Sequence, residues 1–113
     1  MNRPVRRDLF PGALEMMVLQ TLRRGPRHAY GLAQYLKTTS DEFLQIEEGS
    51  LYPALQRMLK AGWISAEWGL SPRGRKVRFF GLTAEGAHRL EREVSAFERM
   101  LEGIARVMRP ART

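Results

Sequence analysis

The stretch from Ser50 to Ala61, Ser-Leu-Tyr-Pro-Ala-Leu-Gln-Arg-Met-Leu-Lys-Ala, decides the fold. Its apolar residues recur at i, i+4, i+7 and i+8, which predicts a helix with one buried face made by Leu51, Leu55, Met58 and Leu59. We expect Ser50 to cap this helix, Pro53 to lie in its first turn and Gly62 to end it. The other face offers hydrogen-bonding and cationic groups to a partner: Tyr52, Gln56, Arg57 and Lys60.

Two shorter helices are predicted before this stretch. Residues 13–24 carry an apolar stripe of Leu14, Met17, Val18 and Leu22. Further apolar residues lie off the stripe, and a helix that is apolar on more than one side can contact a second subunit as well as its own core. Residues 28–38 form the second helix. A polar connection, 39–49, follows it, and within this connection Ile46 is a candidate for a short β bridge.

Two strands are predicted after the third helix. Residues 63–68 alternate with a period of two, and residues 77–82 return as a second strand, so that the turn-rich loop 69–76 joins them into a hairpin. We expect Trp63 and Trp68 to fill the core or an interface.

A long helix is predicted for residues 83–108, with Thr83 as its N-cap. Its apolar residues recur at spacings of 3 and 4 over three heptads: Ala87, Leu90, Val94, Phe97, Leu101, Ile104 and Met108. At 1.5 Å per residue the helix would be about 39 Å long, more than the rest of a small domain can cover. We expect a second copy of the chain to bury the seam, and the alternative is packing over the chain's own first helix.

Composition excludes several classes of protein. The chain has 113 residues, 43% hydrophobic and 27% charged, as in a single globular domain. It has no cysteine, which excludes disulfides and thiolate metal sites. The sequence shows no catalytic constellation, no phosphate-binding glycine loop, no signal peptide and no apolar run of about 20 residues. We therefore expect a cytoplasmic protein that is not an enzyme, has no cofactor and does not enter the membrane.

The positive charge is concentrated in two places. Nineteen Lys and Arg against twelve Asp and Glu give a net charge of +7. Four cations and no acid lie within six residues in or next to the hairpin loop, which indicates phosphate as a partner. The first seven residues add Arg3, Arg6 and Arg7, whereas the long last helix is nearly neutral.

The order helix, helix, helix, hairpin, helix is that of a winged helix-turn-helix, in which the third helix enters the major groove of DNA. The hairpin loop then follows the DNA backbone or minor groove. The fold class is mainly α with a small β-hairpin, and three segments are expected. Residues 1–12 form a flexible basic arm, 13–82 the winged-helix DNA-binding domain, and 83–113 a C-terminal dimerisation helix and tail.

The runs Gly49-Ser50-Leu51-Tyr52-Pro53-Ala54-Leu55 and Leu82-Thr83-Ala84-Glu85-Gly86 resemble the PadR family of bacterial transcriptional regulators. The resemblance covers about residues 13–100. It implies a homodimeric winged-helix DNA-binding protein, in most cases a repressor, with Ser50, Tyr52 and Pro53 at the start of the recognition helix and Tyr30 near phosphate. The family's His-Gly-Tyr motif has Ala29 in its middle position here. Some members bind flat aromatic effectors, but the last helix offers only Phe97 as an aromatic residue.

We therefore expect a homodimer that binds double-stranded DNA, and we predict which residues form each of the two interfaces. The predicted DNA-binding residues are Tyr30, Ser50, Tyr52, Pro53, Gln56, Arg57, Lys60, Arg73, Arg75, Lys76 and Arg78. The predicted dimer-interface residues are Leu14, Met17, Leu90, Val94, Phe97, Leu101, Ile104 and Met108. Two alternatives stay open, a winged-helix protein-interaction adaptor and a dimer that senses a small-molecule effector.

Overall fold

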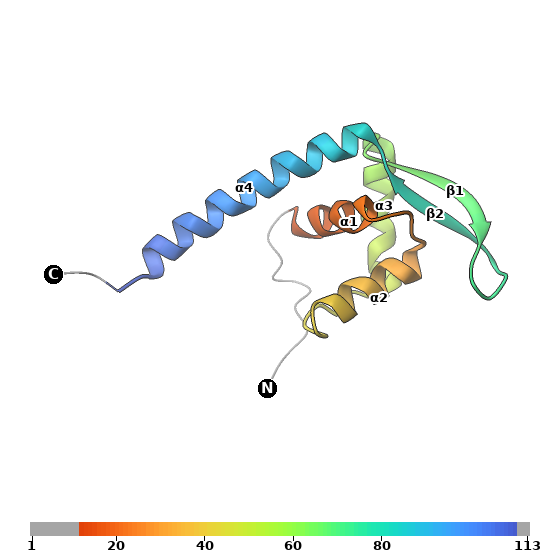
Figure 1. Ribbon diagram of the computed structural model, residues 1–113, viewed down its shortest axis with the longest axis horizontal. Coiled ribbons are helices and arrows are strands. Elements are labelled where there is room, and N and C mark those ends of the chain that lie inside the picture. Colours follow the sequence, from red (N-terminus) through yellow and green to blue (C-terminus); the bar gives the residue numbers. More distant parts are fainter. Residues whose placement is uncertain (1–11, 111–113) are drawn as a thin grey trace.

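The computed structural model describes residues 12–110. The expected basic arm, with Arg3, Arg6 and Arg7, lies outside them. The described elements are α1 (Ala13–Arg23), α2 (Ala29–Thr39), α3 (Glu48–Ala61), β1 (Ile64–Leu70), β2 (Lys76–Leu82) and α4 (Ala84–Met108). Figure 1 shows α1, α2 and α3 gathered together, the β-hairpin extending from them at one end, and α4 passing α1 before it continues beyond the other elements. The predicted winged-helix architecture is confirmed.

All four helices and both strands contribute to one hydrophobic core. The core side chains come from every element and are almost fully buried: Leu19, Leu32, Leu51, Leu55, Met58, Ile64, Phe80 and Leu90. The four predicted apolar positions of α3 pack as expected, with Leu59 only partly buried. Because α3 is held along its whole apolar face, its polar face keeps a defined orientation toward solvent.

The start of α3 differs from the prediction. The helix begins at Glu48, two residues before the expected cap, and Ser50 donates its backbone N–H to the carbonyl of Glu47 at 3.0 Å. A carboxylate at the first helical position is stabilised by the positive end of the helix dipole, so the helix can begin without a side-chain cap. Pro53 therefore lies in the second turn, inside the helix and on its exposed side, where water can satisfy the carbonyl left without an N–H partner.

The hairpin is longer than predicted because β1 continues to Leu70 and β2 starts at Lys76. Its strands are antiparallel, with Ile64 opposite Leu82 at one end and Leu70 opposite Lys76 at the other. The predicted bridge at Ile46 is wrong, since the backbone there pairs with no strand, and its side chain is buried in the core. The isolated bridge instead joins Arg27 to Phe80, so that the segment before α2 is tied to β2.

The first turn of α4 is fixed to the end of α3. Thr83 is the predicted cap: its Oγ1 accepts a hydrogen bond from the N–H of Gly86 at 3.0 Å and donates one to the carbonyl of Gly62 at 2.7 Å. A Cβ on Gly86 would lie 2.0 Å from the carbonyl oxygen of Trp63. Only glycine permits this approach, so the position and direction of α4 are set at its start.

The heptad seam of α4 lies in two environments. Leu90 is 1% exposed within its own chain, so its assignment to the dimer interface is wrong: α1 and the core already cover it. Leu14, Met17 and Val94 also pack partly against this core. From residue 101 to residue 110 every residue is exposed, including Leu101 and Ile104. Within residues 12–110 no helix is both long enough and apolar enough to cross a bilayer.

Candidate nucleic-acid interface

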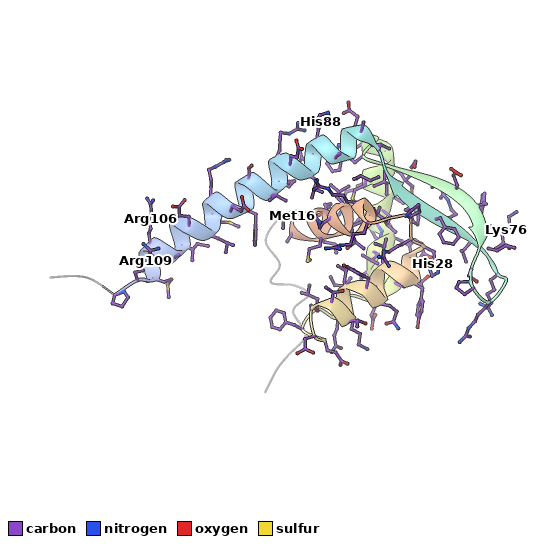
Figure 2. All side chains as sticks on the ribbon, viewed as in Figure 1. Met16, His28, Lys76, His88, Arg106 and Arg109 are labelled. Carbon is purple, nitrogen blue, oxygen red and sulfur yellow. The ribbon has the colours of Figure 1, made fainter. Side chains whose placement is uncertain are left out.

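A groove of about 920 Å³ lies between the N-terminal half of α2, the polar face of α3 and the hairpin. Each of these three elements contributes side chains to its walls. Figure 2 shows His28, at the start of α2, and Lys76, on the hairpin, at the same end of the molecule. The two faces predicted to meet DNA, the polar face of α3 and the hairpin cations, therefore border one continuous surface.

The α2 wall is built around His28, whose Nδ1 accepts a hydrogen bond from the N–H of Gly31 at 3.0 Å and so caps the helix. The His28 ring stacks on Tyr30, with 6.4 Å between centroids, and meets the edge of Phe79 at 5.4 Å. The hydroxyl of Tyr30 accepts a hydrogen bond from Gln34 at 3.2 Å. These contacts order an exposed phenol at the edge of the groove.

The α3 wall presents Tyr52 and Gln56 on successive turns, together with Glu48 one turn earlier. The hydroxyl of Tyr52 donates a hydrogen bond to Oε2 of Glu48 at 3.0 Å. Partial burial, and then this bond and the charge of Glu48, raise the pKa of Tyr52 above its ordinary value of 10.0, so the phenol stays a hydrogen-bond donor at neutral pH. Gln56 is exposed, and its amide can pair with adenine through two hydrogen bonds.

The hairpin wall carries all four predicted cations: Arg73, Arg75, Lys76 and Arg78. Ser71 holds the loop in shape, since its carbonyl accepts from the N–H of Gly74 at 2.8 Å and its N–H donates to the carbonyl of Arg75 at 2.8 Å. Gly74 takes a positive φ of 79°, a conformation that other residues rarely adopt. The four like charges thus lie on an ordered loop and the strand that follows it, where an adjacent row of phosphates would stabilise them.

The structure does not bring every predicted residue to this groove. Ser50, Pro53 and Lys60 are exposed on α3 but are not among the lining residues. Arg57 turns toward α1, where its Nη2 forms an ion pair with Oε2 of Glu15 at 2.7 Å. The side chain of Arg57 is thereby occupied in joining α3 to α1, on a different side of the helix from Gln56.

The predicted DNA-binding set missed several lining residues, among them His28, Glu48 and Trp68. Glu48 could have been found from its spacing, because it precedes Tyr52 by four residues on the same helix face. Trp68 was expected to fill the core or an interface, and it does not fill the core, since 63% of it is exposed within this chain. The alternation along β1 places Trp68 on the core-facing side of the strand, but the strand extends beyond the core. Trp63 is half-buried against the core, as predicted.

Solved structures share this fold over almost their whole length. A transcriptional regulator from Clostridium thermocellum superimposes with a TM-score of 0.82 at 22% identity, covering 93% of this chain and 99% of its own. A PadR-like transcriptional regulator from Bacillus cereus gives a TM-score of 0.76 at 25% identity, covering 89% and 96%. An uncharacterised protein from Lysinibacillus sphaericus is 29% identical over 82 residues, which are 73% of this chain and 75% of the relative.

The model of the Transcriptional regulator PadR-like family matches residues 18–92. The matched region contains α2, α3 and the hairpin, and so contains every residue that lines the groove. The resemblance noted from the sequence motifs is therefore confirmed. Members of this family regulate transcription by binding DNA and are not enzymes. By its sequence and its fold, the chain belongs to the PadR-like family of transcriptional regulators.

Proposed function

We propose that this regulator is a repressor that binds a pseudo-palindromic operator as a homodimer. The observation that carries the proposal is the groove, which sets four cations of the hairpin beside Tyr52 and Gln56 of α3. Cations bind phosphate whatever the sequence, whereas amides read base edges. One surface thus combines the two kinds of contact that a sequence-specific DNA-binding protein needs.

In the proposed complex α3 enters the major groove. Gln56 and Tyr52 face base edges, with Ser50 and Pro53 near the start of the same helix, and Tyr30 approaches a phosphate from α2. The hairpin cations follow the adjacent backbone or minor groove. Lys60 is placed to reach a phosphate from the end of α3, whereas Arg57 can reach DNA only by leaving Glu15.

The second half of the proposal is the homodimer. The C-terminal half of α4 exposes Leu101 and Ile104 at 45% and 43%, and Met108 at 75%. These residues, with Phe97 and Val94 before them, continue one seam that a second copy of the chain would bury. Two subunits would then present two α3 helices to half-sites about 34 Å apart, one turn of DNA. Bound at an operator in the cytoplasm, the dimer would exclude RNA polymerase.

DNA binding is tested by fluorescence anisotropy of the full chain with labelled fragments from upstream of its own coding sequence. The variant Arg73→Ala/Arg75→Ala removes two hairpin cations, and we expect weaker binding and a shallower salt dependence, by about 0.9 in the logarithmic slope per lost phosphate contact. The matched control is Arg92→Ala/Arg99→Ala, which removes two exposed cations from α4 outside the groove. Equal effects of the two double variants would contradict the groove as the DNA site.

Base reading is tested in the same assay with Gln56→Ala. We expect a loss of about 1 to 3 kcal/mol on the operator, together with relaxed discrimination at one base pair. A loss that is uniform across unrelated sequences would instead make Gln56 a phosphate contact. Repression is tested with a reporter under the upstream region, whose output should rise when the gene is deleted; a fall would indicate an activator.

A further inference from the structure

The indole of Trp68 is exposed in a place where charge surrounds it. A large aromatic side chain is normally well covered in a small domain, yet 63% of Trp68 is exposed, and it lines the groove with the hairpin cations. Phosphate neutralisation alone does not require an aromatic ring at this position. The exposure of Trp68 therefore needs a cause other than core packing.

Two of the cations rest on this ring. Nζ of Lys76 lies 5.2 Å from the Trp68 ring centroid, and Cζ of Arg78 lies 6.0 Å from it. The strand register explains both contacts, because Arg78 is directly opposite Trp68 and Lys76 is its diagonal neighbour. Cζ of Arg78 also lies 5.8 Å from the ring of Phe80, so it is placed between two aromatic rings. Among the aromatic rings, indole attracts cations most strongly.

We propose that Trp68 is a positioning residue of the hairpin, which holds Lys76 and Arg78 in the arrangement that binds the phosphodiester backbone of double-stranded DNA. Long cationic side chains lose conformational freedom when they are fixed on a ligand. Cations that already rest on the indole lose less of this freedom on binding. The proposal rests on the proposed DNA binding. It adds Trp68, an uncharged residue that a search for cationic DNA-binding side chains would not find.

The first test needs no DNA. In the free protein the ring current of Trp68 should shift the Cε protons of Lys76 and the Cδ protons of Arg78 upfield in a proton–carbon NMR spectrum. The shift should persist, reduced, in Trp68→Phe. In Trp68→Leu, which keeps an apolar side chain on the strand, it should vanish for Lys76 and decrease for Arg78, which also lies near the ring of Phe80. Unshifted protons in the wild-type protein overturn the proposal, whatever the protein binds.

The second test is a double-mutant cycle on affinity for the operator fragment. We expect Trp68→Leu to weaken binding about tenfold and to make its salt dependence shallower, with partial recovery in Trp68→Phe. In the background Lys76→Ala/Arg78→Ala, the same Trp68→Leu change should cost little, because the cations that it positions are gone. Phe43→Leu is the matched control, since Phe43 is 54% exposed but does not line the groove.

The outcomes separate this proposal from the proposed function. Wild-type protein that shows the NMR shifts but binds no DNA contradicts the proposed function and leaves the ordering of the cations established. Full loss from Trp68→Leu in the Lys76→Ala/Arg78→Ala background, or loss with an unchanged salt slope, would show a direct apolar contact between Trp68 and DNA. Either result overturns the positioning role, and so does unchanged affinity in Trp68→Leu.

Discussion

The two halves of α4 share one heptad seam and differ in what covers it. In the N-terminal half Leu90 is 1% exposed, because α1 and the core of the same chain lie against it. Eleven residues later, Leu101 lies on the same seam and is 45% exposed. The first half is also fixed in place, by the Thr83 cap and by the close approach of Gly86 to Trp63. Figure 1 shows the second half extending beyond the other elements.

The difference teaches that a heptad pattern identifies the face of a helix that will be buried and does not identify the partner. The lengths of α1 and α4 decide which part of the seam is covered within the chain. α1 has 11 residues and α4 has 25, which at 1.5 Å per residue correspond to about 16 Å and about 37 Å. α1 can therefore cover less than half of the seam. The remainder is exposed in a single chain and is available to a second copy.

The largest expected effect comes from Leu90→Glu, in the covered half. This change removes a fully buried side chain and places a carboxylate in the core, so we expect a loss of about 5 kcal/mol or more, comparable with the whole stability of a small domain. Circular dichroism during urea unfolding should show a chain that is largely unfolded without denaturant. Leu90→Met is the control, and its cost should stay below about 1.5 kcal/mol. A folded, monomeric Leu90→Glu protein would place Leu90 in the dimer interface after all.

Leu101→Glu, in the exposed half, should leave the fold intact and separate the subunits. Loss of one leucine contact and repulsion between two carboxylates should weaken the dimer by about 3 kcal/mol, or roughly a hundredfold in Kd. Sedimentation velocity measures the change, and circular dichroism reports the fold. Ala96→Glu adds the same charge to an exposed position off the seam and should leave the dimer unchanged. Dimers that persist in Leu101→Glu would show that another surface joins the subunits.

Gly86→Ala tests the close contact between Gly86 and Trp63 that fixes the N-terminal half of α4. Its new Cβ would lie 2.0 Å from the carbonyl oxygen of Trp63 and 2.8 Å from Cδ1 of Leu82, so the backbone must move. We expect a loss of about 2 kcal/mol in the free energy of unfolding, typical of an overpacked site. Gly49→Ala, which meets nothing within 4 Å, is the matched control. Similar stability of the two variants would mean that α4 is free to shift at its start.

A pattern within one element identifies an apolar face but not what covers it, and this explains which sequence-based predictions failed. Periodicity located the four helices and the hairpin, because local spacing alone determines which side chains share a face. It misplaced Leu90, which was expected at the dimer interface and lies in the core. It also did not show that Trp68, expected to fill the core or an interface, is exposed within its own chain. Each lies on the apolar side of its element. What covers that side depends on how far the neighbouring elements extend, which the pattern within one element does not contain.

Contacts between side chains that are far apart in the sequence could not be predicted for a related reason. Arg57 was predicted to face DNA because it lies on the polar side of α3, but Glu15 is 42 residues earlier in the chain and lies within reach only after α1 packs on α3. The cap of α4 was predictable, since Thr83 and Gly86 are three residues apart. Short-range contacts can thus be inferred from spacing, and contacts between distant segments require the fold.

The smallest expected effect is that of Gly103→Ala, in the exposed half. Gly103 lies off the seam, and a Cβ there would meet nothing within 4 Å. Alanine stabilises a helix interior by up to about 1 kcal/mol relative to glycine, so the C-terminal half of α4 should become more stable without a change in the dimer. Amide hydrogen exchange along residues 97–108 measures the stability of this half of the helix, and sedimentation velocity measures the dissociation constant of the dimer. If the dimer weakened instead, the partner helix would have to approach the backbone at Gly103, and the face of α4 buried between subunits would be rotated away from the line of Leu101 and Ile104.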